Sequence, residues 1–238
     1  MKKKCLCLIV FICVSIISIV SFGFNIYFFA TKPLSASGIF DIAKNSVVEI
    51  MAETDDVGMS YGSGVIVSNN GMIVTNAHVV THKKLGQNNV FDKISIRLVD
   101  EQDFREVSVI KYDSELDIAV LKLTCNRNLR SIKIGDDSVL NYGDKVYAVG
   151  NMSNYGISFT TGYIAIPHID VTYNNITRNV IQCDLTISDG NSGGALIDKD
   201  GKLIGITSFR LKDQSNNIIY GISYCIPVNA VLKYIENN

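Results

Sequence analysis

The stretch Gly190-Asn191-Ser192-Gly193-Gly194, followed by the β-type run Ala195-Leu196-Ile197, carries the most information about this chain. A nucleophilic serine must be approached closely by a substrate carbonyl, and its neighbours should present backbone N–H groups to the oxygen that becomes negative. Glycine permits both because it has no Cβ atom. Asn, Ser and Gly also dominate ordinary turns. Taken alone, the stretch fits a turn as well as a nucleophile, so its surroundings must decide.

Short β-rich runs separated by turn signals recur on both sides of this stretch. One group lies within residues 46–123 and a second within residues 145–226. Asn69-Asn70-Gly71 and Asp200-Gly201 are strong hairpin signals. Only residues 228–238 predict a helix, which would close the chain. We therefore expect an all-β fold of two six-stranded antiparallel β-barrels, with a functional crevice between them.

The N-terminus has a different composition from the rest of the chain. Lys2-Lys3-Lys4 precede an uncharged, apolar stretch over residues 5–30. At ~1.5 Å per residue this stretch reaches about 39 Å as a helix, enough to cross a hydrocarbon core of ~30 Å. It is longer than the apolar core of a cleavable signal peptide, usually ~7–15 residues, so we favour a retained transmembrane signal-anchor. The expected organisation is then a cytoplasmic segment at 1–4, the membrane span, a stalk at 31–45 and an extracytoplasmic domain at 46–238.

Charge and cysteine content exclude several classes of function. Residues 1–32 hold four of the 22 basic residues and none of the 23 acidic ones, which leaves the exported part mildly acidic and without a basic stripe for nucleic acid. Outside the apolar segment only Cys125, Cys183 and Cys225 remain. Their odd number and spacing fit neither a zinc site nor a disulfide framework. We expect buried free thiols, although one bridge and a leftover thiol remain possible.

A serine nucleophile needs a base, usually histidine, and this sequence has three histidines. His78 ends an apolar run, whereas His82 lies beside two lysines in an expected surface loop and His168 follows a proline between strands. A metalloprotease helix pairing the first two would need Glu at position 79, where Val79 stands. His78 is the best candidate.

Asp117 is the best candidate for the acid that orients the histidine, because it opens the apolar run Ile118-Ala119-Val120-Leu121. The pattern Gly190-x-Ser192-x-Gly194 also fits the nucleophile elbow of α/β-hydrolases. That fold needs its acid and histidine after the serine, and no histidine follows residue 168. The available order His, Asp, Ser suits a double β-barrel serine hydrolase.

Three segments in this order resemble the HtrA/Deg serine proteases of trypsin-like fold. They are Thr75-Asn76-Ala77-His78-Val79-Val80, Asp117-Ile118-Ala119-Val120-Leu121 and Gly190-Asn191-Ser192-Gly193-Gly194-Ala195-Leu196. Gly62-Ser63-Gly64-Val65-Ile66-Val67, Ala148-Val149-Gly150-Asn151, Ile181-Gln182-Cys183-Asp184 and Gly205-Ile206-Thr207 are also similar to that family. The resemblance covers roughly residues 46–235.

The resemblance implies a role for each residue. Ser192 attacks the peptide carbonyl, His78 transfers the proton and Asp117 holds the imidazole. The backbone N–H groups of Gly190 and Ser192 form the oxyanion hole. A small-to-medium aliphatic substrate pocket is expected from Thr186, Ile187, Ile206 and Thr207. No metal or organic cofactor is implied.

The sequence also departs from relatives in this fold. Asn191 replaces the aspartate that receives a freed N-terminus in digestive enzymes, and Asp189 stands where HtrA proteins more often have Pro or Arg. The PDZ domain that usually follows the protease domain is not expected here. Homotrimers are frequent in the family. The sequence thus predicts a membrane-anchored extracytoplasmic serine endopeptidase acting on unfolded or damaged proteins. The alternative is a catalytically silent, protease-like binding or chaperone module on the membrane.

Overall fold

The computed structural model describes residues 12–24, 34–152, 155–173, 175–211, 215 and 217–237. The chain divides into two compact units, residues 1–34 and 35–238. In the first unit, residues 12–24 are helical. Within the described residues, no helix combines the length and the apolar character that a membrane crossing requires. The rest of the expected span 5–30, and the expected cytoplasmic segment 1–4, lie outside the described residues.

The second unit begins with the helix α2 (Ala36–Ala43), which ends in a 3-10 turn over Lys44–Ser46. The Ser35 hydroxyl accepts a hydrogen bond from the Gly38 N–H at 3.1 Å, so it satisfies one of the free donors of the first helical turn. The buried side chains Ile39 and Ala43 pack α2 against the core.

A seven-stranded antiparallel sheet forms the first half of this unit. Its order is β7-β6-β1-β2-β3-β9-β8, so β7 and β8 lie at opposite edges although only Val107 separates them in the chain. One continuous segment therefore forms both edge strands, pairs with β6 at one end and with β9 at the other, and closes the sheet into a barrel. Two strands form here, and not one continuous strand, because the chain changes its pairing partner at Val107. The strands are β1 (Val47–Thr54), β2 (Gly58–Ile66), β3 (Met72–Thr75), β6 (Lys93–Leu98), β7 (Arg105–Glu106), β8 (Ser108–Asp113) and β9 (Ile118–Lys122).

Between β3 and β6 the chain forms a short helix and a separate hairpin. The helix α3 (Ala77–Val80) follows β3 directly, and the hairpin consists of β4 (Thr81–Lys84) and β5 (Gln87–Val90). The sequence predicted a loop at His82, because the residues of this hairpin do not alternate between apolar and polar.

The second half also closes on itself. Its order is β10-β15-β14-β11-β12-β13-β16, and β16 pairs with β15 as well as with β13, which completes a ring of six strands. Regular pairing of the last strand begins only at Ser223. The strands are β10 (Lys133–Ile134), β11 (Lys145–Asn151), β12 (Ile157–Tyr173), β13 (Ile176–Cys183), β14 (Ala195–Ile197), β15 (Lys202–Phe209) and β16 (Ser223–Pro227), with a 3-10 turn over Asp137–Val139.

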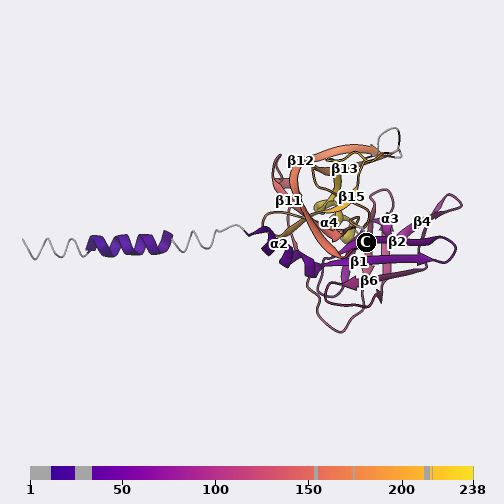
Figure 1. Cartoon of the computed structure of the whole chain (residues 1–238), viewed down its shortest axis with the longest axis horizontal. Helices are drawn as coiled ribbons and strands as arrows, with labels where there is room; N and C mark the ends of the chain where they lie inside the picture. The colour runs from indigo at the N-terminus through magenta and orange to yellow at the C-terminus, as the bar shows by residue number, and fades with distance from the viewer. Residues whose placement is uncertain are drawn as a thin grey trace, which may run out of the picture. The chain divides into compact units, whose positions relative to one another are not determined.

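Figure 1 shows the two barrels side by side, with the early strands in indigo to magenta and the later strands in orange to yellow. Each barrel has its own apolar core, and a third cluster fills the space between them and beneath the helix α4 (Val228–Glu236). Lys111 of the first barrel donates to the carbonyl oxygens of Tyr234 and Ile235 at the end of α4, at 2.8 and 3.1 Å. The closing helix predicted at 228–238 therefore lies across the junction of the barrels and contacts both of them.

Candidate active site

His78 and Asp117 meet at the end of the first barrel. His78 lies on α3, directly after β3, and Asp117 immediately precedes β9, the strand that pairs with β3. Asp117 adopts a φ of 59°, a left-handed conformation that Asp tolerates better than most residues. Asn76 donates its side-chain N–H to the Asp117 carbonyl oxygen at 3.0 Å. This contact holds the unusual backbone turn in place.

The carboxylate of Asp117 is buried and surrounded by donors. His78 Nδ1 lies 2.9 Å from both carboxylate oxygens, and the His78 backbone N–H donates to Oδ1 at 3.1 Å. The Ser208 hydroxyl donates to Oδ2 at 2.7 Å. Burial raises the pKa of Asp117, but the charge and hydrogen bonds of His78 and the Ser208 hydroxyl outweigh it, so the pKa lies below its ordinary value. Asp117 is therefore a carboxylate that fixes the imidazole through Nδ1 and leaves Nε2 for chemistry.

Two successive tight turns present Ser192. The Asn191 N–H donates to the Ser188 carbonyl at 3.0 Å, and the Gly194 N–H donates to the Asn191 carbonyl at 2.9 Å. Gly190 and Gly193, the third residues of these turns, have φ values of 93° and 83°. A turn in which only the third residue has a positive φ is a type II turn, and this turn type favours glycine at that residue. A Cβ atom on Gly193 would also lie 2.1 Å from the Ser63 carbonyl oxygen, so a side chain has no room there.

The first barrel fastens this loop through Ser63 of β2, whose side chain is fully buried. Its hydroxyl donates to the Gly190 carbonyl at 2.7 Å and accepts from the Asn151 N–H at 2.8 Å. Its backbone N–H donates to the Ser192 carbonyl at 2.8 Å. The nucleophile loop of the second barrel is thus positioned by a strand of the first.

Both proposed oxyanion donors remain free for a ligand. In the part of the chain that the structure describes, neither the Gly190 N–H nor the Ser192 N–H donates to a backbone carbonyl. The turn over Ser188–Asn191 uses the Asn191 N–H instead. Two neighbouring N–H groups without an internal partner can bind a negative oxygen.

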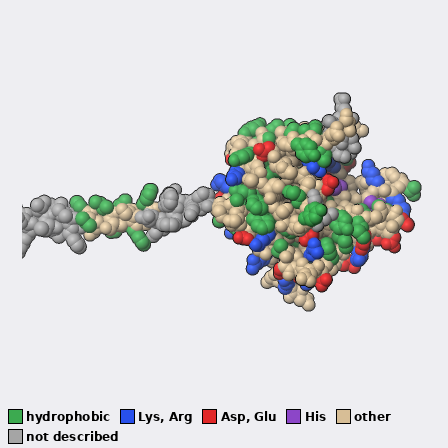
Figure 2. Space-filling view, in the orientation of Figure 1, with side chains coloured by type: hydrophobic (Ala, Val, Ile, Leu, Met, Phe, Trp, Pro, Cys, Tyr) green, Lys and Arg blue, Asp and Glu red, His purple; other side chains and the backbone are tan. Residues whose placement is uncertain are grey.

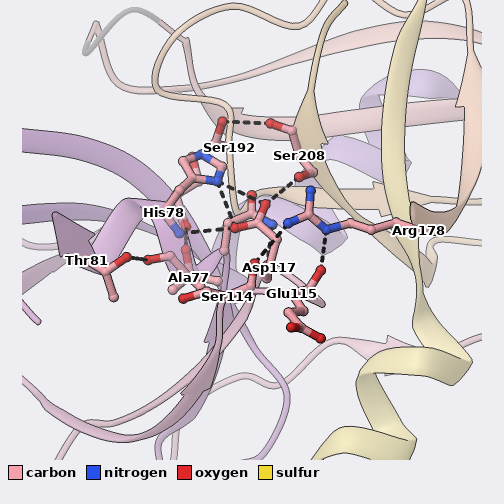
Figure 3. Close-up of polar contacts among 12 residues, drawn as sticks. Ala77, His78, Thr81, Ser114, Glu115, Asp117, Arg178, Ser192 and Ser208 are labelled. Atoms are coloured by element: carbon pink, nitrogen blue, oxygen red, sulfur yellow. Dashed lines mark hydrogen bonds and ion pairs between the residues drawn. The ribbon is translucent and has the colours of Figure 1, made fainter. Parts of the chain in front are cut away.

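Figure 3 shows the ring of His78 beside Ser192. The Ser192 hydroxyl donates to the Ser208 carbonyl oxygen at 2.9 Å, and among the described residues no hydrogen bond joins it to His78. Hydrogen bonds between a nucleophile and its base are often loose without substrate. Rotation about the Cα–Cβ bond of Ser192 is the movement that would direct its oxygen toward the ring.

The loop that leads into Asp117 is held from the second barrel. Arg178 of β13 donates through Nε to the Glu115 carbonyl and through Nη2 to the Ser114 carbonyl, the latter at 2.9 Å. Figure 3 shows both contacts of the guanidinium with this loop. The Asp113 carboxylate accepts the N–H groups of Glu115 and Leu116 from the other side. Sequence reasoning missed Arg178, Ser208 and Ser63 as supporting residues, because their partners are remote in the chain.

A cleft of about 470 Å³ contains His78, Asp117 and Ser192. Of the four residues expected to line a substrate pocket, the structure places only Ile187 on the cleft wall. Thr186 is exposed and accepts from Thr160 through its carbonyl, Ile206 is buried in the core between the barrels, and Thr207 donates to the Asn191 carbonyl. The wall is made instead by Phe209, the last residue of β15, and by residues after it, among them Arg210 and Ile218.

The remaining histidines and cysteines lie elsewhere. The His82 ring packs against Phe91, with ring centres 5.0 Å apart, and the His168 ring lies beside the Asn179 side chain. Cys125, Cys183 and Cys225 are free thiols, as expected, but only Cys183 and Cys225 are buried, whereas Cys125 is half-buried. A hydrogen bond with Cys183, together with burial, raises the pKa of Cys225 well above its ordinary value. Within the described ranges, no three His, Cys, Asp or Glu side chains come together as metal ligands.

Comparison with known proteins agrees with this geometry. Residues 62–206 match the family model of the trypsin-like peptidase domain. A probable periplasmic serine endoprotease, DegP-like, of Rickettsia prowazekii is 38% identical over 178 residues, which are 74% of this chain and 33% of that protein. The serine endoprotease DegS of Haemophilus influenzae is 36% identical over 180 residues, 74% of this chain and 50% of that protein.

Among solved structures, the HtrA-type protease AlgW with a tripeptide has a TM-score of 0.72 and 30% sequence identity. The match covers 85% of this chain and 63% of that one. This chain thus spans about a third to a half of the length of the DegP-like and DegS relatives, and less than two thirds of the solved one. The family model, which covers more than half of the chain, and these relatives show that the chain belongs to the trypsin-like peptidases, within their HtrA group.

Proposed function

We propose that this chain is a serine endopeptidase that hydrolyses peptide bonds through an acyl-enzyme on Ser192. The observation that supports this most strongly is the contact of His78 Nδ1 with Asp117 at 2.9 Å, in the cleft that also contains Ser192. An imidazole held in this way has its proton on Nδ1, so Nε2 can accept the Ser192 proton and later donate one to the leaving amine. The carbonyl oxygen of the substrate would accept from the Gly190 and Ser192 N–H groups as it becomes negative.

The proposed reaction begins with a change in one hydrogen bond. When substrate enters, the Ser192 hydroxyl gives up its hydrogen bond to the Ser208 carbonyl oxygen and donates to His78 Nε2 instead. Its oxygen then attacks the peptide carbonyl as its proton moves to the imidazole ring. The Ser208 hydroxyl continues to donate to Asp117 throughout. The imidazolium formed in this step is stabilised by the buried carboxylate, whose pKa keeps it ionised.

Labelling with a fluorophosphonate probe tests the triad and the oxyanion donors together, because the probe reacts only with an activated serine. The full chain in detergent should be labelled and should degrade casein, whereas Ser192→Ala should do neither. Loss of Ser192 or His78 should lower kcat by on the order of 10⁶-fold. If the wild-type chain and Ser192→Ala are equally unlabelled and neither cleaves casein, the chain is a silent binding or chaperone module instead.

The setting of the enzyme is a second part of the proposal. We propose that residues 5–30 anchor the chain in a membrane, that the domain acts outside the cytoplasm, and that unfolded or damaged polypeptides are its substrates. The apolar composition of residues 5–30 supports an anchor, and relatives described as periplasmic support the location. Alkaline carbonate should leave the full chain in the membrane fraction, and protease added to intact cells stripped of their outer layers should degrade its domain. Extraction by carbonate would refute the anchor.

Assembly is proposed on the family resemblance alone. We propose a homotrimer, which sedimentation of the purified full chain in a density-matched detergent would detect as a complex of three chains. A single chain at micromolar concentration would refute it.

A further inference from the structure

The hairpin of β4 and β5 begins directly after the helix that carries His78. Its turn is Leu85-Gly86, with φ values of 54° and 81°, and two positive values identify a type I′ turn. The pairing sets Lys83 opposite Asn88 and His82 opposite Asn89. The hairpin is therefore a regular two-stranded element beside the catalytic histidine, not an irregular loop.

Side chains alternate between the two faces of this hairpin. Thr81, Lys83 and Asn88 line the cleft that contains Ser192. His82 belongs to the other face and packs against Phe91, and Lys84 follows with the same orientation because successive residues of a strand point to opposite sides. Figure 2 shows blue side chains over the part of the molecule where Figure 1 labels β4. Of the two neighbouring lysines, one thus faces the catalytic cleft and the other faces away from it.

Two hydrogen bonds hold this face of the hairpin against the active site. The Asn88 side chain donates to the Ser114 hydroxyl at 2.9 Å, in the loop that leads into Asp117. The Thr81 hydroxyl donates to the Ala77 carbonyl at 2.9 Å. The backbone at Lys83 is therefore fixed beside the cleft, although its side chain is exposed.

A second cation, Arg178, also lines the cleft. Both of its hydrogen-bond partners among the described residues are neutral carbonyl oxygens, those of Ser114 and Glu115, so the hydrogen bonds do not neutralise its charge. In Figure 3 the carboxylate of Glu115 points away from the guanidinium. Arg210, also on the cleft wall, differs because Asp189 forms an ion pair with it at 3.0 Å.

The cleft is therefore lined by two cations, Lys83 and Arg178, whose positive charges are not compensated by a carboxylate among the described residues. Throughout the described ranges, no ion pair involves Lys83 or Arg178. The carboxylate of Asp117 is buried and already accepts from His78 and Ser208. Cations without a carboxylate partner, beside a bound chain, attract acidic side chains and repel basic ones.

We propose that Lys83 and Arg178 form a subsite for an acidic side chain of the substrate, so that the enzyme selects polypeptide segments with Asp or Glu near the bond it cleaves. This proposal rests on the endopeptidase function proposed above. Each exposed charge pair changes affinity by about 1.5- to 5-fold, so two together should give about a 2- to 25-fold preference for Glu over the isosteric Gln.

Matched peptides test this subsite. The sites at which the full chain cuts casein are mapped by mass spectrometry, and one cleaved segment is then synthesised with Glu, Gln or Lys at each of the four positions before the cleaved bond. At one of these positions kcat/KM should fall in the order Glu, Gln, Lys, and 0.5 M NaCl should reduce the difference. Equal values at all four positions would overturn the proposal.

The two lysines of the hairpin provide a matched control. Lys83→Glu should reverse the order of the peptides, whereas Lys84→Glu, with the same change of charge at the next residue, should keep it. If both substitutions change the order of the peptides equally, the preference arises from the overall charge of the domain, and a subsite at Lys83 is excluded. Arg178→Lys should keep the preference for Glu but lower kcat, because a lysine retains the charge and loses the two-pronged contact with the loop before Asp117.

Binding separates this proposal from the proposed function. Ser192→Ala cannot turn over substrate, and anisotropy of the labelled Glu and Gln peptides measures its affinity directly. A preference for Glu that Lys83→Glu abolishes supports the subsite even if the wild-type chain cleaves nothing, an outcome that refutes only the peptidase. Cleavage of casein together with equal affinities for the two peptides would refute the subsite alone.

Discussion

Replacement of Ser63 by alanine tests whether the first barrel positions the nucleophile loop of the second. The serine hydroxyl donates to the Gly190 carbonyl at 2.7 Å and accepts from the Asn151 N–H at 2.8 Å, and its side chain is fully buried. Alanine removes both hydrogen bonds and leaves a buried carbonyl and a buried N–H without their partner. Each lost bond costs about 0.5–1.5 kcal/mol, and an unsatisfied buried group costs about 1–3 kcal/mol. We therefore expect the free energy of unfolding to fall by about 2–4 kcal/mol.

Activity should fall more than this loss of stability explains. Gly190 also provides one of the proposed oxyanion donors, and complete removal of such a donor lowers kcat by about 10²- to 10³-fold. Ser63→Ala keeps the donor but removes the contact that fixes the next peptide group. We expect kcat to fall by about 10- to 100-fold, with little change in KM, at a temperature where the variant is fully folded.

The assay combines urea unfolding with peptide hydrolysis on the full chain. Ser60→Ala is the matched control, because Ser60 lies on the same strand and, within the described residues, its side chain forms no hydrogen bond. It should leave both quantities unchanged. A stability loss with normal kcat would show that Ser63 acts only in folding. If both quantities are normal, the two hydrogen bonds do not contribute and the reasoning is wrong.

Three further substitutions test other contacts. Gly193→Ala places a side chain at a positive φ and in a clash, so it should lower the free energy of unfolding by urea by about 3–5 kcal/mol. Gly143→Ala is the control, because φ there is 81° and no atom lies within 4 Å of the added Cβ, and it should cost about 1–2 kcal/mol. Equal losses for the two variants would contradict the clash. Lys111→Met removes the charged donor to the end of α4 and should cost about 1–2 kcal/mol, against no change for Lys133→Met at an exposed position without such a contact. Asp117 has a lowered pKa in the folded chain, so it adds stability at pH values above its ordinary pKa of about 4, and that stability is lost as pH falls further. The unfolding free energy of wild type minus that of Asp117→Asn should therefore rise between pH 3 and pH 5, and a decrease over this range would refute the assignment.

The candidate triad could be predicted because its signals are local. The sequence has only three histidines, so the candidate base could be found by excluding two of them. The glycines around Ser192 indicated tight turns, and the structure contains these turns. The two groups of strands were visible because buried strands alternate or run apolar. The hairpin of β4 and β5 gave no such signal, since lysine, glutamine and asparagine fill it and Leu85 occupies the left-handed turn position where Asn or Gly is usual.

The supporting contacts could not be predicted, because they join residues remote in the sequence. The hydroxyls of Ser63 and Ser208 reach partners 127 and 91 residues away. The substrate wall was misplaced for a related reason. Ile206 continues the apolar run of β15 and enters the core, while the wall begins where the strand ends, at Phe209 and Arg210. Strand patterns identify buried faces, but they do not show which loop covers a cleft.

The contacts across the cleft divide the site between the two barrels in both directions. Ser63 of the first barrel holds the loop of Ser192, while Ser208 and Arg178 of the second hold Asp117 and the loop before it. Neither barrel therefore contains a complete site, and each orients the reactive group of the other. A small shift between the barrels would lengthen all three contacts at once, while the separate core of each barrel would remain packed. Perturbations at the junction should thus reduce catalysis before they unfold either barrel, which is the opposite of the order expected for substitutions inside a barrel core.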